Sequence, residues 1–241
     1  MADGPRGDDR PGAASPRDVV ARPVCGPGCA CTIGNEFSER EVRDDLRRFR
    51  RSGPDRTTRL LLEGLSAGGV AGMTVLDIGA GIGVVHQQLL ADGAARATDV
   101  EGSPAYLDAA RNEAARLGTT DRVRYELGDF VAIAPSLEPA DLVALDRVVC
   151  CYPDADALVS LSVDLATRRY GLVYPRDTWW LRMGGAVLNG FADLLHRRTK
   201  AYIHRTADVE AILGRAGFTA TFRRRTLVWQ VAVFERATTA G

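Results

Sequence analysis

One short segment constrains the fold of this 241-residue chain more than any other. An apolar run ends on an acid and continues into three glycines, in the order Val75-Leu76-Asp77-Ile78-Gly79-Ala80-Gly81-Ile82-Gly83. The apolar run predicts a strand, the glycines predict a tight turn, and the helical pattern that follows predicts a helix. In open α/β sheets a ligand lies beyond the carboxyl ends of such strands, where glycine lets the backbone come close to it. We therefore expect a ligand site at this turn.

Short apolar runs alternate with helical patterns along the rest of the chain. This alternation is typical of parallel strands joined by right-handed crossovers. Strands are expected at 74–78, 96–100, 123–127, 142–145 and 170–174, and helices at 84–92, 104–117 and 207–216. Two further runs, 218–223 and 227–235, predict a β-hairpin. The predicted fold class is α/β: a Rossmann-like doubly wound sheet, mostly parallel, with an antiparallel terminal hairpin.

The region before the glycine segment predicts a tail and a pair of helices. Residues 1–23 are rich in Asp, Arg, Gly and Pro without apolar periodicity, which predicts a disordered tail. Apolar residues recur at helical spacing over 36–51 and again over 57–65. We expect these two amphipathic helices to form an N-terminal helical cover over residues 24–68.

The remaining residues, 69–241, are expected to form the main domain. Within it, an aromatic and apolar insertion at about 175–205 follows the fifth predicted strand and includes Trp179 and Trp180. An insertion at this place is expected to shape the substrate pocket. Core or lid packing is the alternative interpretation of the tryptophan pair.

The glycine spacing separates two kinds of nucleotide site. A dinucleotide fingerprint, G-x-G-x-x-G counted from Gly79, needs a third glycine where this chain has Val84. The segment instead resembles the first motif of class I S-adenosylmethionine-dependent methyltransferases, in which an acid precedes G-x-G-x-G by two residues. The resemblance implies S-adenosyl-L-methionine as the cofactor and a first group of cofactor-binding residues: Asp77, Gly79, Ala80, Gly81 and Gly83.

Two later motifs extend the resemblance. The second predicted strand ends at Glu101-Gly102-Ser103-Pro104, where the family usually has an acid that accepts the ribose hydroxyls. Glu101 and Gly102 are therefore expected to bind the cofactor, with Asp99 as the competing acid. Gly128-Asp129-Phe130 resembles the family's Gly-Asp-apolar motif and implies that Asp129 accepts from the adenine amino group beside Phe130. For Asp129 alone, a helix cap is the alternative.

The segment after the fourth predicted strand, from Asp146 to Asp154, corresponds to the family's active-site segment. There Asp146 is expected to face the methionine end of the cofactor or the substrate. The Asn/Asp-Pro-Pro-aromatic run of nucleic-acid amino methyltransferases is missing. Cys150 and Cys151 are interpreted as small buried apolar residues, and contact with substrate or metal is the alternative.

Three cysteines near the N-terminus have C-x3-C-x-C spacing, which lacks the paired C-x2-C of common zinc sites. It also differs from the iron–sulfur pattern of radical S-adenosylmethionine enzymes. We therefore predict no metal site, and a soft-ligand site that would favour metalloid methylation is the alternative. The three residues are Cys25, Cys29 and Cys31.

Catalytic candidates are few. Of the three histidines, His86 falls in the first crossover helix and His196 in an arginine-rich stretch, so His204 is expected nearest the pocket. His204 and Asp146 are the predicted catalytic residues, since either could act as a general base. A surface imidazole is the alternative for His204. The strand, the aromatic-rich helix and this late histidine bear a likeness, over the C-terminal third, to magnesium-protoporphyrin methyltransferases.

Charge and composition limit the partners. Basic and acidic residues balance at 31 each, so no overall field favours nucleic acid, and the predicted substrate is a small molecule. No apolar run approaches the roughly 18 residues of a membrane span, and no signal-peptide pattern is present, so a cytoplasmic location is expected. The sequence thus predicts a small-molecule methyltransferase. A non-catalytic cofactor-binding or scaffold protein is the alternative, and tetrapyrrole carboxylates and metalloids are minor substrate options.

Overall fold

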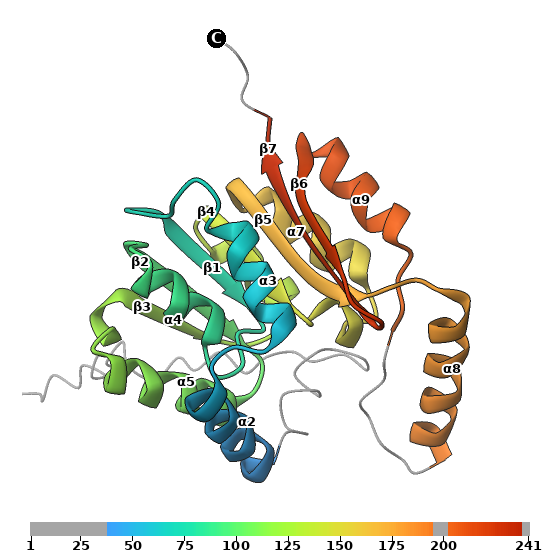
Figure 1. Ribbon diagram of the computed structural model, residues 1–241, viewed down its shortest axis with the longest axis horizontal. Coiled ribbons are helices and arrows are strands. Elements are labelled where there is room, and N and C mark those ends of the chain that lie inside the picture. Colours follow the sequence, from blue (N-terminus) through green and yellow to red (C-terminus); the bar gives the residue numbers. More distant parts are fainter. Residues whose placement is uncertain (1–37, 195–201, 238–241) are drawn as a thin grey trace, which may run out of the picture.

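In the computed structural model, which describes residues 38–194 and 202–237, seven strands form one sheet with helices on both faces (Figure 1). The strands are β1 (Thr74–Ile78), β2 (Arg96–Glu101), β3 (Val123–Leu127), β4 (Ala140–Asp146), β5 (Ala166–Pro175), β6 (Phe218–Arg225) and β7 (Trp229–Arg236). Their order across the sheet is β3-β2-β1-β4-β5-β7-β6. The first five strands are parallel, and β7 is antiparallel to both β5 and β6. This confirms the predicted Rossmann-like sheet with an antiparallel terminal hairpin.

Helices connect most of the strands. The described α-helices are α2 (Glu39–Ser52), α3 (Arg56–Leu65), α4 (Val84–Ala91), α5 (Pro104–Leu117), α6 (Phe130–Ile133), α7 (Ala155–Asp164), α8 (Trp179–Leu194) and α9 (Thr206–Arg215). Three short 3-10 helices are η1 (Thr120–Arg122), η2 (Ala134–Ser136) and η3 (Val149–Cys151). Helix α7 was not among the predicted elements. It begins where the Asp154 side chain accepts from the Ala157 backbone N–H, which is a standard N-cap.

The first described helix is fixed at both ends by local contacts. Ser38 accepts a hydrogen bond from the Glu41 backbone, and the Glu41 carboxylate accepts from the Ser38 N–H, which together form a capping box. At the other end, Gly53 adopts a positive φ of 70° and Pro54 follows. The helix therefore starts at Glu39, and the earlier part of the predicted span 36–51 lies outside the described residues.

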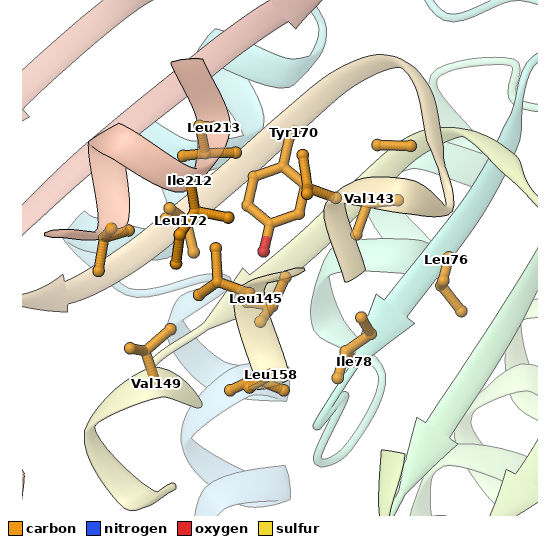
Figure 2. Close-up of a cluster of buried hydrophobic side chains, with 14 of the residues drawn as sticks. Leu76, Ile78, Val143, Leu145, Val149, Leu158, Tyr170, Leu172, Ile212 and Leu213 are labelled. Atoms are coloured by element: carbon orange, nitrogen blue, oxygen red, sulfur yellow. The ribbon is translucent and has the colours of Figure 1, made fainter. Parts of the chain in front are cut away.

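Alternating side chains of the strands build the core on both faces of the sheet. On one face, Leu76, Val143 and Leu145 pack with Tyr170 and with α7 and α9, as Figure 2 shows. Because successive strand residues point to opposite faces, the intervening positions of the same strands meet α3 and α4 on the other side. Helices therefore cover both faces of the central strands.

The two helices that precede the sheet, α2 and α3, pack on different elements. Helix α3 contacts β5 and β7 with buried leucines that include Leu61 and Leu65. Helix α2 instead lies beside α5, where the Arg50 guanidinium pairs with the buried Glu113 carboxylate at 2.7 Å. The division into a cover at 24–68 and a domain at 69–241 stays a prediction.

Two strands start earlier than predicted. Strand β5 begins at Ala166 rather than at Tyr170. Its first residues are mostly polar, and one of them, Arg169, pairs with Glu235 of β7 at 2.8 Å. A pattern that seeks apolar residues does not detect such a start. Strand β4 likewise begins at Ala140, two residues before the predicted apolar run.

Helix α8 stands apart from the sheet in Figure 1 and occupies the predicted insertion. Trp179 is 73% exposed, so this residue is not core packing. In the described part of the chain, no helix combines the length and the apolar character needed to cross a bilayer. The predicted tail, His196 and the three N-terminal cysteines lie outside the described residues.

Candidate active site

A cavity of about 540 Å³ lies beyond the carboxyl ends of β1, β2 and β4. The loop from β1 to α4 forms its floor, and the corner between α2 and α3 forms part of its wall. This is the place where open α/β sheets bind ligands. Most of the residues expected to bind the cofactor line it: Asp77, Gly79, Ala80, Gly81, Glu101, Gly102, Asp129, Phe130 and Asp146.

Asp77 links the cavity to the helix behind it. Its Oδ2 atom accepts from the backbone N–H of His86 at 3.2 Å and lies 3.0 Å from His86 Nδ1. Because α4 has no side-chain cap of its own at Gly83, the Asp77 carboxylate satisfies part of the helix N-terminus from the neighbouring strand. Both Asp77 and His86 are buried. The histidine thus holds the carboxylate in a fixed orientation at the cavity floor.

The glycine loop passes close to the segment that follows β4. Gly79 has a φ of 64°, and a Cβ atom at this position would lie 2.6 Å from a Val148 side-chain methyl. Its N–H donates to the Val100 carbonyl at 2.7 Å. Any larger residue would displace the loop, so the glycine is required both by conformation and by space.

Glu101 lies at the end of β2 with both carboxylate oxygens oriented by the backbone. Oε2 accepts from Gly81 N–H at 2.8 Å, and Oε1 accepts from Ser103 N–H at 2.8 Å. Burial raises the pKa of Glu101, and the N–H donors of Ser103, Gly81 and Gly102 oppose that shift. A carboxylate held in this way on the cavity wall can also accept hydroxyl donors.

Asp99, the competing acid, is in a different environment. It is fully buried, does not line the cavity, and has no hydrogen-bond partner for either oxygen in the described structure. His86 Nε2 lies 4.0 Å from its Oδ2. Burial, followed by the charges of Asp77 and Glu101, raises the pKa of Asp99 to about 9. The geometry therefore favours Glu101 as the acid that faces a ligand.

Asp129 has a structural role as well as a place on the cavity wall. Its Oδ1 atom caps α6 by accepting from Val131 N–H at 3.1 Å, and it accepts from the Tyr152 hydroxyl at 2.8 Å. Asp129 therefore caps a helix and also lines the cavity. The Tyr152 contact fixes the segment after β4 against the end of β3.

At the end of β4, a polar group joins the sheet to the N-terminal helices. The Thr58 hydroxyl donates to Asp146 Oδ2 at 2.5 Å, and Arg147 Nε lies 3.1 Å from Asp146 Oδ1. Arg147 also forms an ion pair with Asp55, the N-cap of α3. Burial raises the pKa of Asp146, while the Arg147 charge and the Thr58 hydroxyl oppose the shift. Asp146 is thus a largely buried carboxyl that has one cation and one hydroxyl as partners at this wall.

Arg147 adopts an unusual backbone conformation. Its φ is 63°, and among the described residues no other non-glycine residue has a positive φ. For residues other than glycine this left-handed conformation is strained, and such strain is concentrated at functional sites. The conformation directs the guanidinium group toward both Asp55 and Asp146.

The structure does not bring every predicted residue to the cavity. Gly83 is the N-cap of α4 and faces His86 rather than the cavity. His204 is outside the described cavity wall, and its Nε2 lies 3.0 Å from the Tyr152 carbonyl oxygen. Its predicted role as a base stays a prediction, without geometric support from this arrangement.

Sequence reasoning missed several residues of the cavity wall. They come from α2 and from the start of α3: Asp45, Arg48, Phe49, Asp55 and Thr58. Arg147, Val148 and Tyr152 belong to the segment that was expected at the active site, but no individual role was predicted for them. The Asp-Arg-Thr-Thr sequence at 55–58 carried a helix-cap signal, but no local pattern connects it with β4. Cys151 also lines the cavity and is only partly buried, while Cys150 is buried as expected.

A doubly wound sheet with an acid-and-glycine loop and a second acid after β2 is the arrangement found in class I S-adenosylmethionine-dependent methyltransferases, and the chain is similar to this family. A family model described as a methyltransferase domain matches residues 75–163. This match indicates a methyltransferase domain, the kind of domain for which S-adenosylmethionine is the cofactor.

Two known proteins are similar to the chain in sequence. The chain is 28% identical over 182 residues to a chloroplastic magnesium protoporphyrin IX methyltransferase of Arabidopsis thaliana, covering 73% of this chain and 55% of that protein. It is 31% identical over 131 residues to a ribosomal protein L11 methyltransferase of Serratia proteamaculans, covering 48% and 42%. The chain spans about half the length of the curated relatives it matches.

A solved structure shares the fold. Magnesium protoporphyrin IX methyltransferase from Synechocystis PCC 6803, with bound S-adenosylhomocysteine, superimposes with a TM-score of 0.62. The sequences are 24% identical, and the match covers 83% of this chain and 100% of that chain. This likeness concerns the fold.

The residues present fit the cofactor. The loop at Gly79 is open only because it has no Cβ atom, and the oriented Glu101 carboxylate is suited to ribose hydroxyls. Asp77 and Asp146 are acidic residues of the same wall, and Asp146 Oδ1 is paired with Arg147 Nε at 3.1 Å. The cavity thus has acidic acceptors suited to the hydroxyl and ammonium groups of the ligand.

Proposed function

We propose that the chain transfers a methyl group from S-adenosylmethionine to a small molecule by in-line displacement. The observation that carries this proposal is the cavity itself. It is lined by the glycine loop and also by residues of the helical cover and of the segment after β4, which include Phe49, Pro54 and Arg147. A mostly apolar pocket of a few hundred Å³ with a small number of charged groups is typical of small-molecule sites.

In this proposal each acid has a distinct task. Glu101 binds the ribose hydroxyls, Asp129 accepts from the adenine amino group, and the glycine loop approaches the ligand through its backbone. Asp77, oriented by His86, and Asp146 attract the positively charged methionine end. Asp99 stays protonated beneath the site and takes no part in binding.

When bound, S-adenosylmethionine supplies a methyl group that its sulfonium centre already activates. The residues around it then need mainly to align the acceptor and exclude water, and alignment alone can lower a barrier by about 7–11 kcal/mol. If the acceptor must lose a proton, Asp146 is placed to take it, with the Thr58 hydroxyl orienting its Oδ2. A general base of this kind contributes roughly 10²–10⁴-fold.

A carboxylate-bearing acceptor, such as a tetrapyrrole, is the second candidate. It is supported by the similarity to magnesium protoporphyrin IX methyltransferase and by Arg48 and Arg147, two cationic residues of the cavity wall. Guanidinium groups recognise carboxylates through paired hydrogen bonds. A carboxylate acceptor would need no general base, so it would make the Asp146 carboxyl dispensable for proton removal.

Ligand identification followed by a turnover screen tests the proposal. The purified full chain is first analysed by mass spectrometry for co-purified S-adenosylmethionine or S-adenosylhomocysteine, and calorimetry should give comparable, roughly micromolar affinities for both. The release of S-adenosylhomocysteine is then measured with carboxylic acids, phenols, amines, thiols, trivalent arsenicals and purified ribosomal protein L11.

Each result has a clear meaning. Turnover with a small molecule, lowered by Arg147→Ala while cofactor affinity persists, supports the proposal. Turnover with ribosomal protein L11 alone would contradict the small-molecule assignment. Cofactor binding without turnover of any acceptor would favour a binding or scaffold protein, and binding of NAD instead would contradict the cofactor.

A further inference from the structure

Two adjacent thiols lie beside the cofactor cavity and have no part in the proposed methyl transfer. Cys150 and Cys151 belong to η3, and their Sγ atoms are 3.8 Å apart. Cys150 is buried and its thiol donates to the Arg147 carbonyl oxygen at 3.2 Å. Cys151 is partly exposed and lines the cavity.

The segment that carries the thiols is held from several sides. Cys151 N–H donates to the Val148 carbonyl at 2.9 Å within η3. Tyr202 N–H, from the stretch before α9, donates to the Cys150 carbonyl at 2.7 Å. The two sulfur atoms are therefore presented together by a fixed piece of backbone.

Their spacing suits one atom bound by both sulfurs. Two sulfurs joined to a single central atom by bonds of about 2.3 Å lie roughly 3.3–3.8 Å apart for bond angles of about 90–110°. The observed 3.8 Å is at the upper end of this range, so a small side-chain rotation is sufficient. The same thiols are poorly placed for a disulfide, because neighbouring Cα atoms are about 3.8 Å apart and disulfides usually need at least about 4.4 Å.

The number of sulfur atoms restricts the ligand further. In residues 38–194 and 202–237, no group of three or more His, Cys, Asp or Glu side chains can hold a metal ion. A bare ion that needs three or four protein ligands is therefore not satisfied at this place. An organic arsenical in the trivalent state already has one bond to carbon and needs only two sulfurs.

The acidity of the pair agrees with this chemistry. The contact between the two sulfur atoms lowers the pKa of Cys151, in opposition to burial, whereas that contact and burial raise the pKa of Cys150. Cys151, which has access to the cavity, is thus the more acidic thiol and the first nucleophile.

We propose that Cys150 and Cys151 form a dithiol site for trivalent organic arsenicals at the edge of the cofactor cavity. With an arsenical oxide, R–As=O, two As–S bonds form and the arsenic–oxygen bond breaks. The oxygen leaves as water with both thiol protons, and arsenic stays trivalent. The site does not depend on which acceptor the enzyme methylates.

Titration with phenylarsine oxide tests the site in the reduced full chain. Because the chain has five cysteines, the background is the Cys25→Ser/Cys29→Ser/Cys31→Ser variant, in which only the pair remains. Intact-mass spectrometry should detect one phenylarsenic adduct per chain, removed by a dithiol but not by an equal concentration of a monothiol. Adding Cys151→Ser, or separately Cys150→Ala, should weaken binding by at least about 100-fold, since one As–S bond is lost.

Two results would overturn the proposal. One is an adduct on the unmodified chain that disappears in the three-serine background, which would place the site among the N-terminal cysteines. The other is an adduct that survives both single changes at the pair with unaltered affinity. Melting curves of each variant show whether it is folded. Because adduct formation needs no cofactor, failure here would be distinct from failure of the methyltransferase proposal.

Discussion

Replacing Asp99 by Asn tests the assignment of the two acids of β2. Asp99 is fully buried without a hydrogen-bond partner among the described residues, and burial with two neighbouring carboxylates raises its pKa to about 9. The folded chain therefore keeps this carboxyl protonated at neutral pH. Asparagine has nearly the same shape and cannot ionise, so the variant isolates the effect of the titration.

The magnitude follows from the two pKa values. In the unfolded chain Asp99 has the ordinary aspartate pKa of 3.8, so between about pH 4 and 9 the folded state holds a proton that the unfolded state has lost. The stability that this group contributes is present below pH 4 and is lost as the pH rises toward 9. The loss approaches about 1.4 kcal/mol per pH unit. The free energy of unfolding of the variant, relative to that of the wild type, should therefore rise by up to about 1.4 kcal/mol for each pH unit.

Urea denaturation at pH 6, 7 and 8 measures this difference, because the titration of every other group is common to both proteins. The affinity for S-adenosylhomocysteine, measured by calorimetry, should stay within about threefold of the wild type. A difference in the free energy of unfolding that is independent of pH would refute the buried protonated acid. A loss of affinity of tenfold or more would make Asp99, rather than Glu101, the ligand-facing acid.

Three further changes have defined outcomes. Glu101→Ala should weaken S-adenosylhomocysteine binding by about 1–3 kcal/mol, or roughly 5- to 160-fold in calorimetry, because charged hydrogen bonds are lost; unchanged affinity would contradict its role. Gly83→Ala should lower the melting temperature, since φ is 82° and the new Cβ would lie 2.6 Å from His86 Cε1, and an unchanged melting temperature would disprove this packing. Replacing Cys25, Cys29 and Cys31 together by serine should leave cofactor affinity and melting temperature nearly constant. If elemental analysis finds stoichiometric zinc or iron in the wild type and none in this variant, the three cysteines form a metal site.

The parts of the fold that have a local pattern were predictable from the sequence. Strand β1 follows from its apolar run, the turn after it from its glycines, and helix α5 from the proline at its first position. Helix α7 and the start of β5 were missed. The first follows an irregular active-site segment, and the second begins with polar residues that pair with β7.

In the site, too, only the residues with a local sequence pattern could be predicted. The acids at strand ends could be named because strand ends carry ligands, but their partners are distant in sequence. Thr58 and Asp146 are separated by 88 positions, and Asp55 and Arg147 by 92. The contact of His86 with Asp77 depends on how α4 sits over β1, which no sequence pattern specifies.

The backbone at Arg147 has a consequence for protein engineering. A left-handed conformation costs a non-glycine residue about 1–2 kcal/mol, so glycine at this position would release that strain. The same exchange would remove the guanidinium between Asp55 and Asp146 and leave two carboxylates facing each other without a cation. The strain released at the backbone is therefore opposed by the repulsion between the two carboxylates, and libraries for stabilisation should hold residue 147 constant.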